Sequence, residues 1–410
     1  MSKDKKGKKV GRNSPCVCGT GLKYKRCCWN RHKENGIKIR ELPKNSFTEI
    51  EAEQSAQRER ESKILAKYGY YLPHIHTIFK GKRYRTVWGT IHWRRQSETF
   101  HEFLIYLLKC SLGEDWRKEQ MALPEADRHI IMQCFQHYQQ WLQDNADEEE
   151  FRLTGRFSGQ PNGYVQYLIS LAFDIYCLQH SLQLQGSVLK RLKKNNDEFQ
   201  GARYEIAVAA IFARGGYKIE FYNESDPQIM KDKHGEFIVL DEQSGARIEV
   251  EAKSKRRSGI LHHEGEQEDA NLLKGNIRSL LNSAMKKKVN GRPYLIFIDL
   301  NSPPTEGKNP LDKPWFDEVM KAVDKETGGI RAGRESGIII TNFSWHYQGK
   351  SRAAKPEHIY SVPMNPAHPV PQEVWDKLSS VLNKYGAIPD LDRILANTPS
   401  TASNDPNVDS

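Results

Sequence analysis

The sequence predicts a mixed α/β protein with a helical middle region and a small cysteine-rich segment near its N-terminus. From about residue 197 onward, helix-like and strand-like patterns alternate along the chain, which is typical of an α/β domain. Residues 97–195 instead carry apolar side chains at spacings of three and four, the pattern of amphipathic helices. Four cysteines lie between positions 16 and 28, in a segment too short to build a hydrophobic core.

We expect six segments along the chain, separated by shifts in composition and charge. They are a disordered basic arm (1–10), a cysteine module (11–32), a mostly helical region (45–196), an α/β domain (197–365), a helical C-terminal extension (366–395) and a disordered tail (396–410).

The positive charge of the chain is concentrated at its start. Residues 1–40 contain thirteen Lys or Arg and two Asp or Glu, whereas the other 370 residues are close to neutral. A basic arm of this kind attracts polyanions such as DNA, RNA or a ribosome surface, and it also fits a solvated tail that keeps the protein soluble. The chain has no apolar run of about 18 residues and no apolar segment behind its basic start, so we expect a cytoplasmic protein with reduced thiols.

The helices and strands follow from periodicity and from turn residues. We expect helices at 45–68, 97–112, 125–144, 162–180, 182–195, 197–214 and 269–288. We expect one or two strands within 71–95, a strand at 217–223, a hairpin over 236–253, and strands at 292–301 and 336–347.

The cysteine cluster has the composition of a zinc site. Cys16 and Cys18 form one pair, and Cys27 and Cys28 form the other. Four thiolates ligate zinc tetrahedrally, and metal binding would supply the folding energy that so short a segment lacks. Disulfides or free thiols are the alternatives, but a reducing compartment opposes the first and the clustering opposes the second.

The stretch "GRNSPCVCGTGLKYKRCC" also resembles the SEC-C motif, which is found at the C-terminus of the bacterial preprotein translocase motor and on many unrelated proteins. The resemblance implies a small zinc-binding hairpin that serves as an interaction tag. In the translocase it contacts a chaperone and a lipid or ribosome surface. The rest of this chain does not resemble a translocase.

A second group of candidate residues lies in "RIEVEAK", at 247–253. Alternation along a strand places Glu249, Glu251 and Lys253 on one face and the apolar residues on the other. If the first face points into a cleft it can hold a metal ion, and if it points outward it is an ordinary solvated surface with cross-strand charge pairs. The short pattern [DE]-x-K alone is not informative, because it recurs at Asp4, Glu61 and Glu306.

The order of helix, strand, strand with E-x-K, helix and strand over about 197–345 resembles the PD-(D/E)xK nuclease superfamily, whose fold is a restriction-endonuclease-like core. Under this resemblance Asp226 and Glu251 would be the metal-binding carboxylates, and Lys253 would position or activate the attacking water. Glu205 would match the helical glutamate of many subfamilies.

Asp226 departs from the family pattern, because Pro227 follows it and 24 residues separate it from Glu251. Asp232 and Asp241 are the other candidates for its position.

The resemblance implies hydrolysis of phosphodiester bonds in DNA or RNA with Mg²⁺ or Mn²⁺ as cofactor. The carbonyl of Ala252 would complete the ligand set, and a lowered pKa would suit Lys253 to its role beside the metal. The basic runs 253–257 and 286–288 would contact the phosphate backbone. The alternative is a non-catalytic protein that uses its SEC-C tag to bind a chaperone, a ribosome or nucleic acid.

The stretch "KGKRYRTVWGTIHWRR" (80–95) mixes basic and aromatic residues. This mixture is typical of proteins that bind single-stranded nucleic acid. It also fits a strand pair with a basic outer face and tryptophans in the core, which is the interpretation that we favour.

Overall fold

The structure is a computed structural model of the whole chain. It describes residues 8–9, 11–14, 16, 22–29, 40–41, 44–70, 74–87, 89–145, 159–181, 184–194, 197–222, 234–242, 244–257, 274–287, 289, 291–305, 307–327 and 335–396. Contacts divide the chain into two compact units, 1–63 and 64–410, which are described separately below.

The N-terminal unit contains few regular elements. Strands β1 (Lys8–Lys9) and β2 (Arg40–Glu41) pair in antiparallel orientation, and a single 3₁₀ turn, η1, covers Tyr24–Arg26. Helix α2 (Lys44–Tyr68) begins in this unit and confirms the helix predicted at 45–68.

The second unit is built on a six-stranded mixed sheet in the order β11-β10-β9-β8-β7-β6. Its strands are β6 (Lys218–Phe221), β7 (Phe237–Leu240), β8 (Arg247–Ser254), β9 (Tyr294–Asp299), β10 (Gly337–Asn342) and β11 (Glu357–Ser361). Strands β6, β7 and β8 form an antiparallel meander, β8, β9 and β10 run parallel, and β11 closes the other edge in antiparallel orientation. The hairpin and strands expected from the sequence are therefore present.

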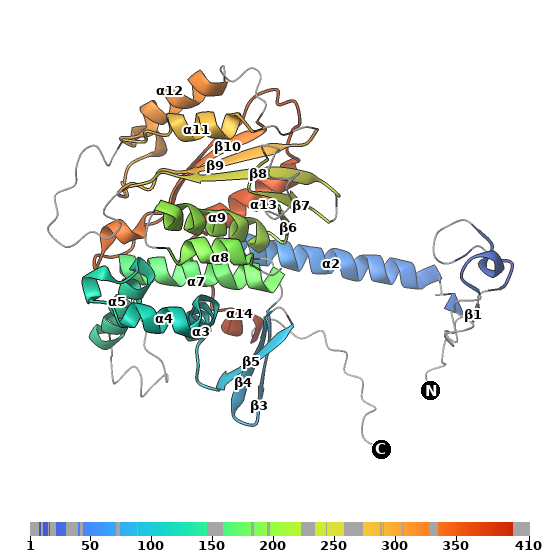
Figure 1. Ribbon diagram of the computed structural model, residues 1–410. Helices are drawn as coiled ribbons and strands as arrows, with labels where there is room; N and C mark the ends of the chain where they lie inside the picture. Colours follow the sequence, from blue (N-terminus) through green and yellow to red (C-terminus); the bar gives the residue numbers. More distant parts are fainter. Residues whose placement is uncertain are drawn as a thin grey trace. The chain divides into compact units, whose positions relative to one another are not determined.

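Helices cover both faces of this sheet, which makes β8 and β9 buried central strands (Figure 1). The helices of the second unit are α3 (Phe100–Leu112), α4 (Glu114–Met121), α5 (Ile130–Asp144), α7 (Gly163–Ser181), α8 (Gly186–Leu192), α9 (Asp197–Arg214), α11 (Arg278–Met285), α12 (Phe316–Thr327), α13 (Gln372–Asn383) and α14 (Leu391–Ala396). Helices α11 and α12 lie on one face of the sheet, and α9 lies on the other, backed by α7 (Figure 1).

Alternation along β8 separates an apolar set of side chains from a charged set, Glu249, Glu251 and Lys253. Ile248, Val250 and Ala252 belong to the larger core, shared with α7 and α9. The smaller core lies under α11 and α12 and contains Ile296 and Ile298 of β9. Because β9 contributes to both cores, its sequence "YLIFID" is apolar at nearly every position.

Local signals fix several element ends. Thr99 and Glu102 form a capping box at the start of α3, with Glu102 N donating to Thr99 Oγ1 over 3.2 Å. Gly216, at φ +81°, follows the end of α9, as the Gly-Gly pair predicts. Helix α4 was not expected, and α5 begins five residues later than the predicted start at 125.

Among the described residues, no helix is both long and apolar enough to cross a membrane.

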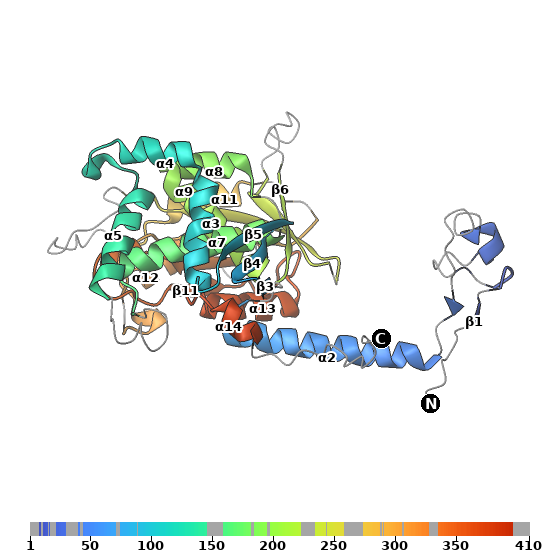
Figure 2. The same cartoon turned by 90° about the horizontal axis from the view of Figure 1, so that it is seen from below.

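Residues 75–95 form three strands, not the expected one or two. Strands β3 (Ile75–Phe79), β4 (Lys82–Val87) and β5 (Thr90–Arg95) make an antiparallel sheet in the order β3-β4-β5. The sheet packs against α7 through β4, on the side of the helices away from the six-stranded sheet (Figures 1 and 2).

The faces of this small sheet contradict the interpretation favoured from sequence. Arg83 and Arg85 lie on its buried face, whereas Trp93 is 59% exposed on its outer face. The arginines are buried because Glu98 and Asp392 pair with them: Arg85 lies 3.0 Å from Glu98 Oε2 and 2.7 Å from Asp392 Oδ2. The other tryptophan of the stretch, Trp88, lies outside the described residues.

Candidate functional site

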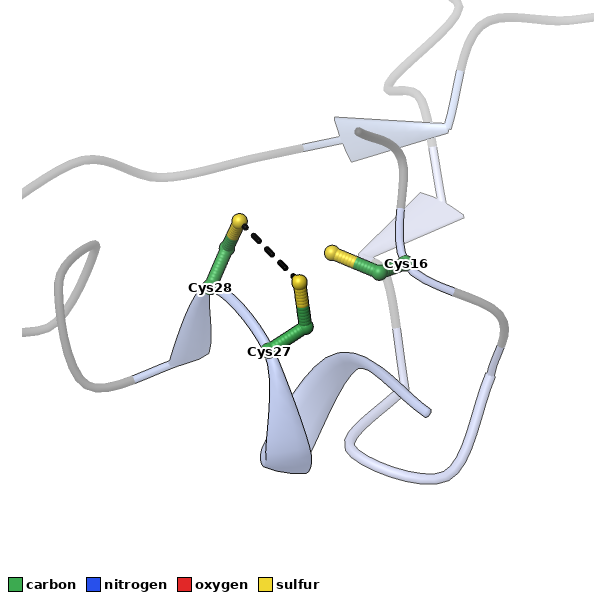
Figure 3. Close-up of side chains that lie close together, drawn as sticks. All are labelled: Cys16, Cys27 and Cys28. Carbon is green, nitrogen blue, oxygen red and sulfur yellow. Dashed lines mark hydrogen bonds between the residues drawn. The ribbon is translucent and has the colours of Figure 1, made fainter. Parts of the chain in front are cut away.

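Three cysteine sulfurs converge in the N-terminal unit. The Sγ atoms of Cys16, Cys27 and Cys28 lie within 4.8 Å of one another, and their side chains point toward a common space (Figure 3). Cys27 and Cys28 are 3.7 Å apart at Sγ. Tetrahedral zinc with Zn–S bonds of ~2.3 Å holds its sulfurs about 3.8 Å apart, so the three thiols fit a zinc site.

Backbone hydrogen bonds and a ring contact hold the thiols in place. Cys16 N donates to Leu22 O over 2.7 Å, and Tyr24 N donates to Ser14 O over 2.8 Å, which folds the chain back on itself. The rings of Tyr24 and Trp29 meet edge to face at 5.6 Å. Among the described residues of the module, the apolar cluster consists of these two rings and the three cysteines, so metal ligation would supply much of its folding energy.

The fourth predicted ligand, Cys18, lies outside the described residues. The donor set that is described consists of thiols, which favour zinc over hard cations such as Mg²⁺. Chemistry and spacing therefore agree with the zinc expected at this site.

The second group of candidates surrounds Glu251 on the central strand β8. The side chain of Glu251 has no exposed surface. Lys253 Nζ lies 2.7 Å from Glu251 Oε1 and 2.8 Å from Glu236 Oε1, so one ammonium group bridges two carboxylates. The solvated-surface alternative for this strand face is wrong, because Glu249 and Glu251 are both buried.

The register of β7 and β8 explains why Glu236 lies beside Glu251 and Lys253. Phe237 pairs with Val250, and Glu236 N donates to Val250 O over 2.8 Å, so Glu236 lies opposite Glu251. Residues opposite each other in an antiparallel pair project from the same face of the sheet. The three charged groups thus come from two adjacent strands.

Glu251 retains unused hydrogen-bonding capacity. Its Oε2 has no hydrogen-bond partner within the described part of the chain. Lys287, just after α11, lies 3.7 Å from Oε1. A buried carboxylate oxygen without a donor is costly, and a bound cation is one way to satisfy it.

Burial shifts the pKa values of the cluster. Burial and the nearby Glu236 charge raise the pKa of Glu251 to about 7, with Lys253 and Lys287 opposing the shift. Burial lowers the pKa of Lys253, but Glu236 and Glu251 raise it by more, so its net pKa lies above the usual value. The lowered pKa expected from the sequence concerned a lysine beside a bound metal and stays a prediction; without metal, Lys253 is a cation.

Glu205 lies on α9 within electrostatic range of this cluster. Burial raises its pKa, and Glu236 raises it further, while Arg191 and Lys253 lower it. Arg191 of α8 holds Glu205 in a two-pronged ion pair, with one hydrogen bond of 2.8 Å from Nη1 to Oε1. Arg191 therefore engages both carboxylate oxygens of Glu205.

Glu249 holds the segment that carries Glu236. Tyr222 Oη donates to both oxygens of Glu249 at 2.6 Å, and Gly235 N donates to Glu249 Oε1 at 2.7 Å. A Cβ at Gly235 would lie 2.5 Å from Val250 O, so only glycine allows this approach of the backbone to β8.

The remaining predicted carboxylates lie elsewhere. Asp226 and its substitute candidate Asp232 are outside the described residues. Asp241 lies at the opposite end of β7 from Glu236, in the turn to β8, where Ser244 Oγ donates to it over 2.6 Å. Of the sequence candidates, Glu251 and Lys253 are in contact, and the structure adds Glu236 and Lys287 to them. Glu205 is paired with Arg191 and influences this cluster only at longer range.

Sequence reasoning missed Glu236. The residue opens the predicted hairpin, and counting back from the 241–246 turn places it opposite Glu251. That register could be predicted from the sequence, but a register shifted by one residue would place Glu236 on the face of the sheet opposite to Glu251.

A further cluster resembles a metal site only by residue type. His74, His76 and Asp392 place ligand atoms within 4.8 Å of one another. Arg83 Nη1 and Arg85 Nη2 lie 3.2 and 2.7 Å from Asp392 Oδ2, and His74 Nδ1 is 2.7 Å from Tyr176 Oη. Two guanidinium groups already neutralise this carboxylate, so the cluster ties α14 to the small sheet and disfavours a cation.

Comparisons with known proteins match the N-terminal segment. Residues 12–30 match the SEC-C motif family, which confirms the resemblance noted in the sequence. The chain is 74% identical over 23 residues to the protein translocase subunit SecA of Finegoldia magna, and 81% identical over 21 residues to that of Syntrophotalea carbinolica. These matches cover 6% and 5% of this chain and 2% of each SecA protein. No solved structure matches the chain.

Proposed function

We propose that this protein is a divalent-metal-dependent nuclease that hydrolyses phosphodiester bonds of DNA or RNA. The observation that carries the proposal is the arrangement of Glu236 and Glu251 around one lysine, with a fully buried carboxylate whose Oε2 has no hydrogen-bond partner among the described residues. A buried and a half-buried carboxylate beside a lysine are a typical setting for a Mg²⁺ or Mn²⁺ ion.

The order of elements supports the same proposal. Helix α9, the antiparallel strands β6, β7 and β8, helix α11 and the parallel strand β9 follow one another along the chain. This order agrees with the restriction-endonuclease-like core that the sequence resemblance implies. The E-x-K residues lie on β8, the strand that directly precedes helix α11, as in the order that the resemblance implies.

Each residue of the cluster then has a role. Glu236 and Glu251 would hold the metal ion, with Glu236 in the role that the sequence analysis gave to Asp226, whose own role stays a prediction. When bound, the ion would polarise a phosphoryl oxygen and stabilise the leaving group. Lys253, released from the two carboxylates, would orient the attacking water and stabilise negative charge on the phosphate. Arg191 and Glu205 would fix the edge of the site.

Cleavage of labelled DNA and RNA strands in Mg²⁺ or Mn²⁺ tests the proposal. We expect activity in the wild type and a loss of at least ~100-fold in Glu251→Gln and Lys253→Met, since each removes a group that acts on the reacting atoms. Glu220→Gln and Lys218→Met, on the edge strand β6, are matched controls that should cleave like the wild type. Equal activity in all five proteins, or none in the wild type, would reject the proposal.

A second candidate function rests on the SEC-C match alone: the zinc module docks the chain to a partner, and the α/β unit is a non-catalytic scaffold. The matched segment makes up 2% of each SecA protein, and in this chain too it accompanies a much larger unit. Reduced thiols are required for such a zinc site, which supports the cytoplasmic location expected from the sequence. Metal-dependent cleavage separates the two functions, because a scaffold has none.

A further inference from the structure

The outer face of the small sheet β3-β4-β5 gathers aromatic, apolar and basic side chains. Cross-strand pairing arranges them in three rows. The rows are Ile75–Thr86–Ile91, Thr77–Tyr84–Trp93 and Phe79–Lys82–Arg95.

This face is open to solvent. Ile75, Phe79, Ile91 and Trp93 expose 59%, 58%, 65% and 59% of their surface. Single exposed apolar residues are common, but four that project from one face of one sheet form a patch, and such patches mark binding surfaces. The opposite face of the same sheet packs on the helices, so the outer face is not part of the core.

Cations accompany the rings. Lys82 Nζ lies 3.8 Å above the centre of the Trp93 ring, and Lys80, in the β3–β4 turn, lies 5.2 Å from the centre of the Phe79 ring. Arg95 lies at the end of the third row, where it pairs with Glu102 of α3 at 2.5 Å. The chain has no Asp or Glu from residue 62 to residue 97, so the strands themselves carry only positive charge.

We propose that this face binds single-stranded nucleic acid. Exposed rings on a sheet give bases a surface for stacking, and lysines beside the rings attract the phosphates. A duplex hides the faces of its bases, so the rings favour a single strand. Lysine is depleted at protein–protein interfaces, which argues against a protein partner or a second copy of this chain.

The face is separate from the Glu251 cluster, because helices lie between the two sheets (Figure 1). The proposal therefore does not rest on metal-dependent cleavage. It is tested by binding, measured with zinc-loaded full-length protein in buffer without added Mg²⁺ or Mn²⁺.

Fluorescence anisotropy of labelled oligo-dT and oligo-rU strands, with a labelled duplex for comparison, gives the affinities. We expect the wild type to prefer a single strand, and Trp93→Ala and Phe79→Ala each to raise its Kd at least about fivefold. Lys82→Ala should weaken binding and make its dependence on salt shallower by about 0.7 in log–log slope, since one phosphate contact is lost.

Two control variants test whether substitution of any exposed apolar or basic residue weakens binding. Leu311→Ala and Lys321→Ala alter an exposed apolar and an exposed basic residue elsewhere and should bind like the wild type. The exposed positions of Trp93 and Lys82 make both variants tolerable, and matching thermal melts check that they fold.

Three results would overturn the proposal. One is unchanged binding in Trp93→Ala, Phe79→Ala and Lys82→Ala, which would assign any affinity to the basic N-terminal arm. Another is equal affinity for the duplex. The third is a wild-type dimer that Trp93→Ala converts to a monomer without loss of strand binding, which would make the face an interface between copies.

Discussion

Glu236 and Glu251 lie opposite each other on adjacent antiparallel strands and share a single ammonium group, that of Lys253, at 2.8 and 2.7 Å. Two carboxylates this close repel each other unless a cation lies between them. In the metal-free protein Lys253 is that cation. A divalent ion would compete with it for the same oxygens, and this competition gives the site distinctive and measurable behaviour.

The first prediction separates metal binding from cleavage. Lys253→Met removes the competing cation, so we expect it to bind Mn²⁺ at least as tightly as the wild type while its cleavage activity is lost. Glu251→Gln should lose both. Isothermal titration with Mn²⁺ and a cleavage assay on the same preparations check this, and a Lys253→Met protein that neither binds Mn²⁺ nor cleaves would contradict it.

The second prediction concerns the stability cost of the buried carboxylate. The pKa of Glu251 is raised to about 7 from an ordinary 4.5, so the native state binds a proton that the unfolded state releases between these pH values. The contribution of Glu251 to the free energy of unfolding is therefore present below pH ~4.5 and lost as pH rises through ~7. At pH 8 without divalent metal, Glu251→Gln should be more stable than the wild type by about 1–3 kcal/mol, since its amide carries no charge to bury.

Thermal melts at pH 5.5 and pH 8 test this directly. The advantage of Glu251→Gln should be larger at pH 8, and added Mg²⁺ should raise the melting temperature of the wild type but not of the variant. Glu220→Gln, on the edge strand β6, should match the wild type at both pH values. A variant less stable than the wild type at pH 8 would show that the ion pair with Lys253 outweighs the burial of charge.

The third prediction follows from the same pKa. A metal ion must displace the proton that Glu251 holds below pH ~7. Mn²⁺ affinity should therefore fall as pH decreases from 8 to 6, and titrations near pH 7 in buffers of different ionisation enthalpy should report proton release. Affinity that does not change across this range would remove Glu251 from the ligand set.

The fourth prediction tests the backbone that carries Glu236. Gly235→Ala forces a Cβ to within 2.5 Å of Val250 O, so the chain must move, at a cost of about 1–3 kcal/mol in the free energy of unfolding and with weaker Mn²⁺ binding. Gly201→Ala in α9 is the matched control, because a Cβ there meets no atom within 4 Å and helix propensity favours alanine. Denaturant unfolding measures both, and equal stability of the two variants would argue against the close approach.

The fifth prediction addresses the zinc module. Metal analysis should find about one zinc per chain, and a Cys27→Ser, Cys28→Ser double variant should lose it, because two of the thiolate ligands are gone. The unit formed by residues 64–410 has its own core, so its main melting transition should persist. Zinc that remains bound in the double variant would place the metal elsewhere in the chain.

Much of the α/β core could be predicted from sequence because its signals are local. Alternation in "RIEVEAK" sorted Glu251 and Lys253 from Val250 and Ala252, and the apolar run of β9 marked a strand buried on both faces. The roles of Lys287 and Arg191 could not be predicted, since α11 and α8 bring them to Glu251 and Glu205 only in the folded chain.

The small sheet shows why a period-two pattern alone does not identify the buried face. Residues 82–95 mix basic side chains with apolar and aromatic ones, and the usual rule places the apolar set inward. Here Arg83 and Arg85 are inward because their partners are a nearby glutamate, Glu98, and an aspartate more than 300 positions away, Asp392. Only the tertiary structure brings Asp392 to the two arginines. Because the arginines occupy the buried face of the sheet, Trp93 lies on the other face and is exposed.

The most direct test of the central claim is Mn²⁺ binding to zinc-loaded protein at pH 8, followed by the electron paramagnetic resonance signal of free Mn²⁺. We expect saturable binding to the wild type and to Glu220→Gln, loss of that binding in Glu251→Gln and Glu236→Gln, and its retention in Lys253→Met. Wild-type protein that leaves the Mn²⁺ signal unchanged, or Glu251→Gln protein that binds as the wild type does, would contradict it.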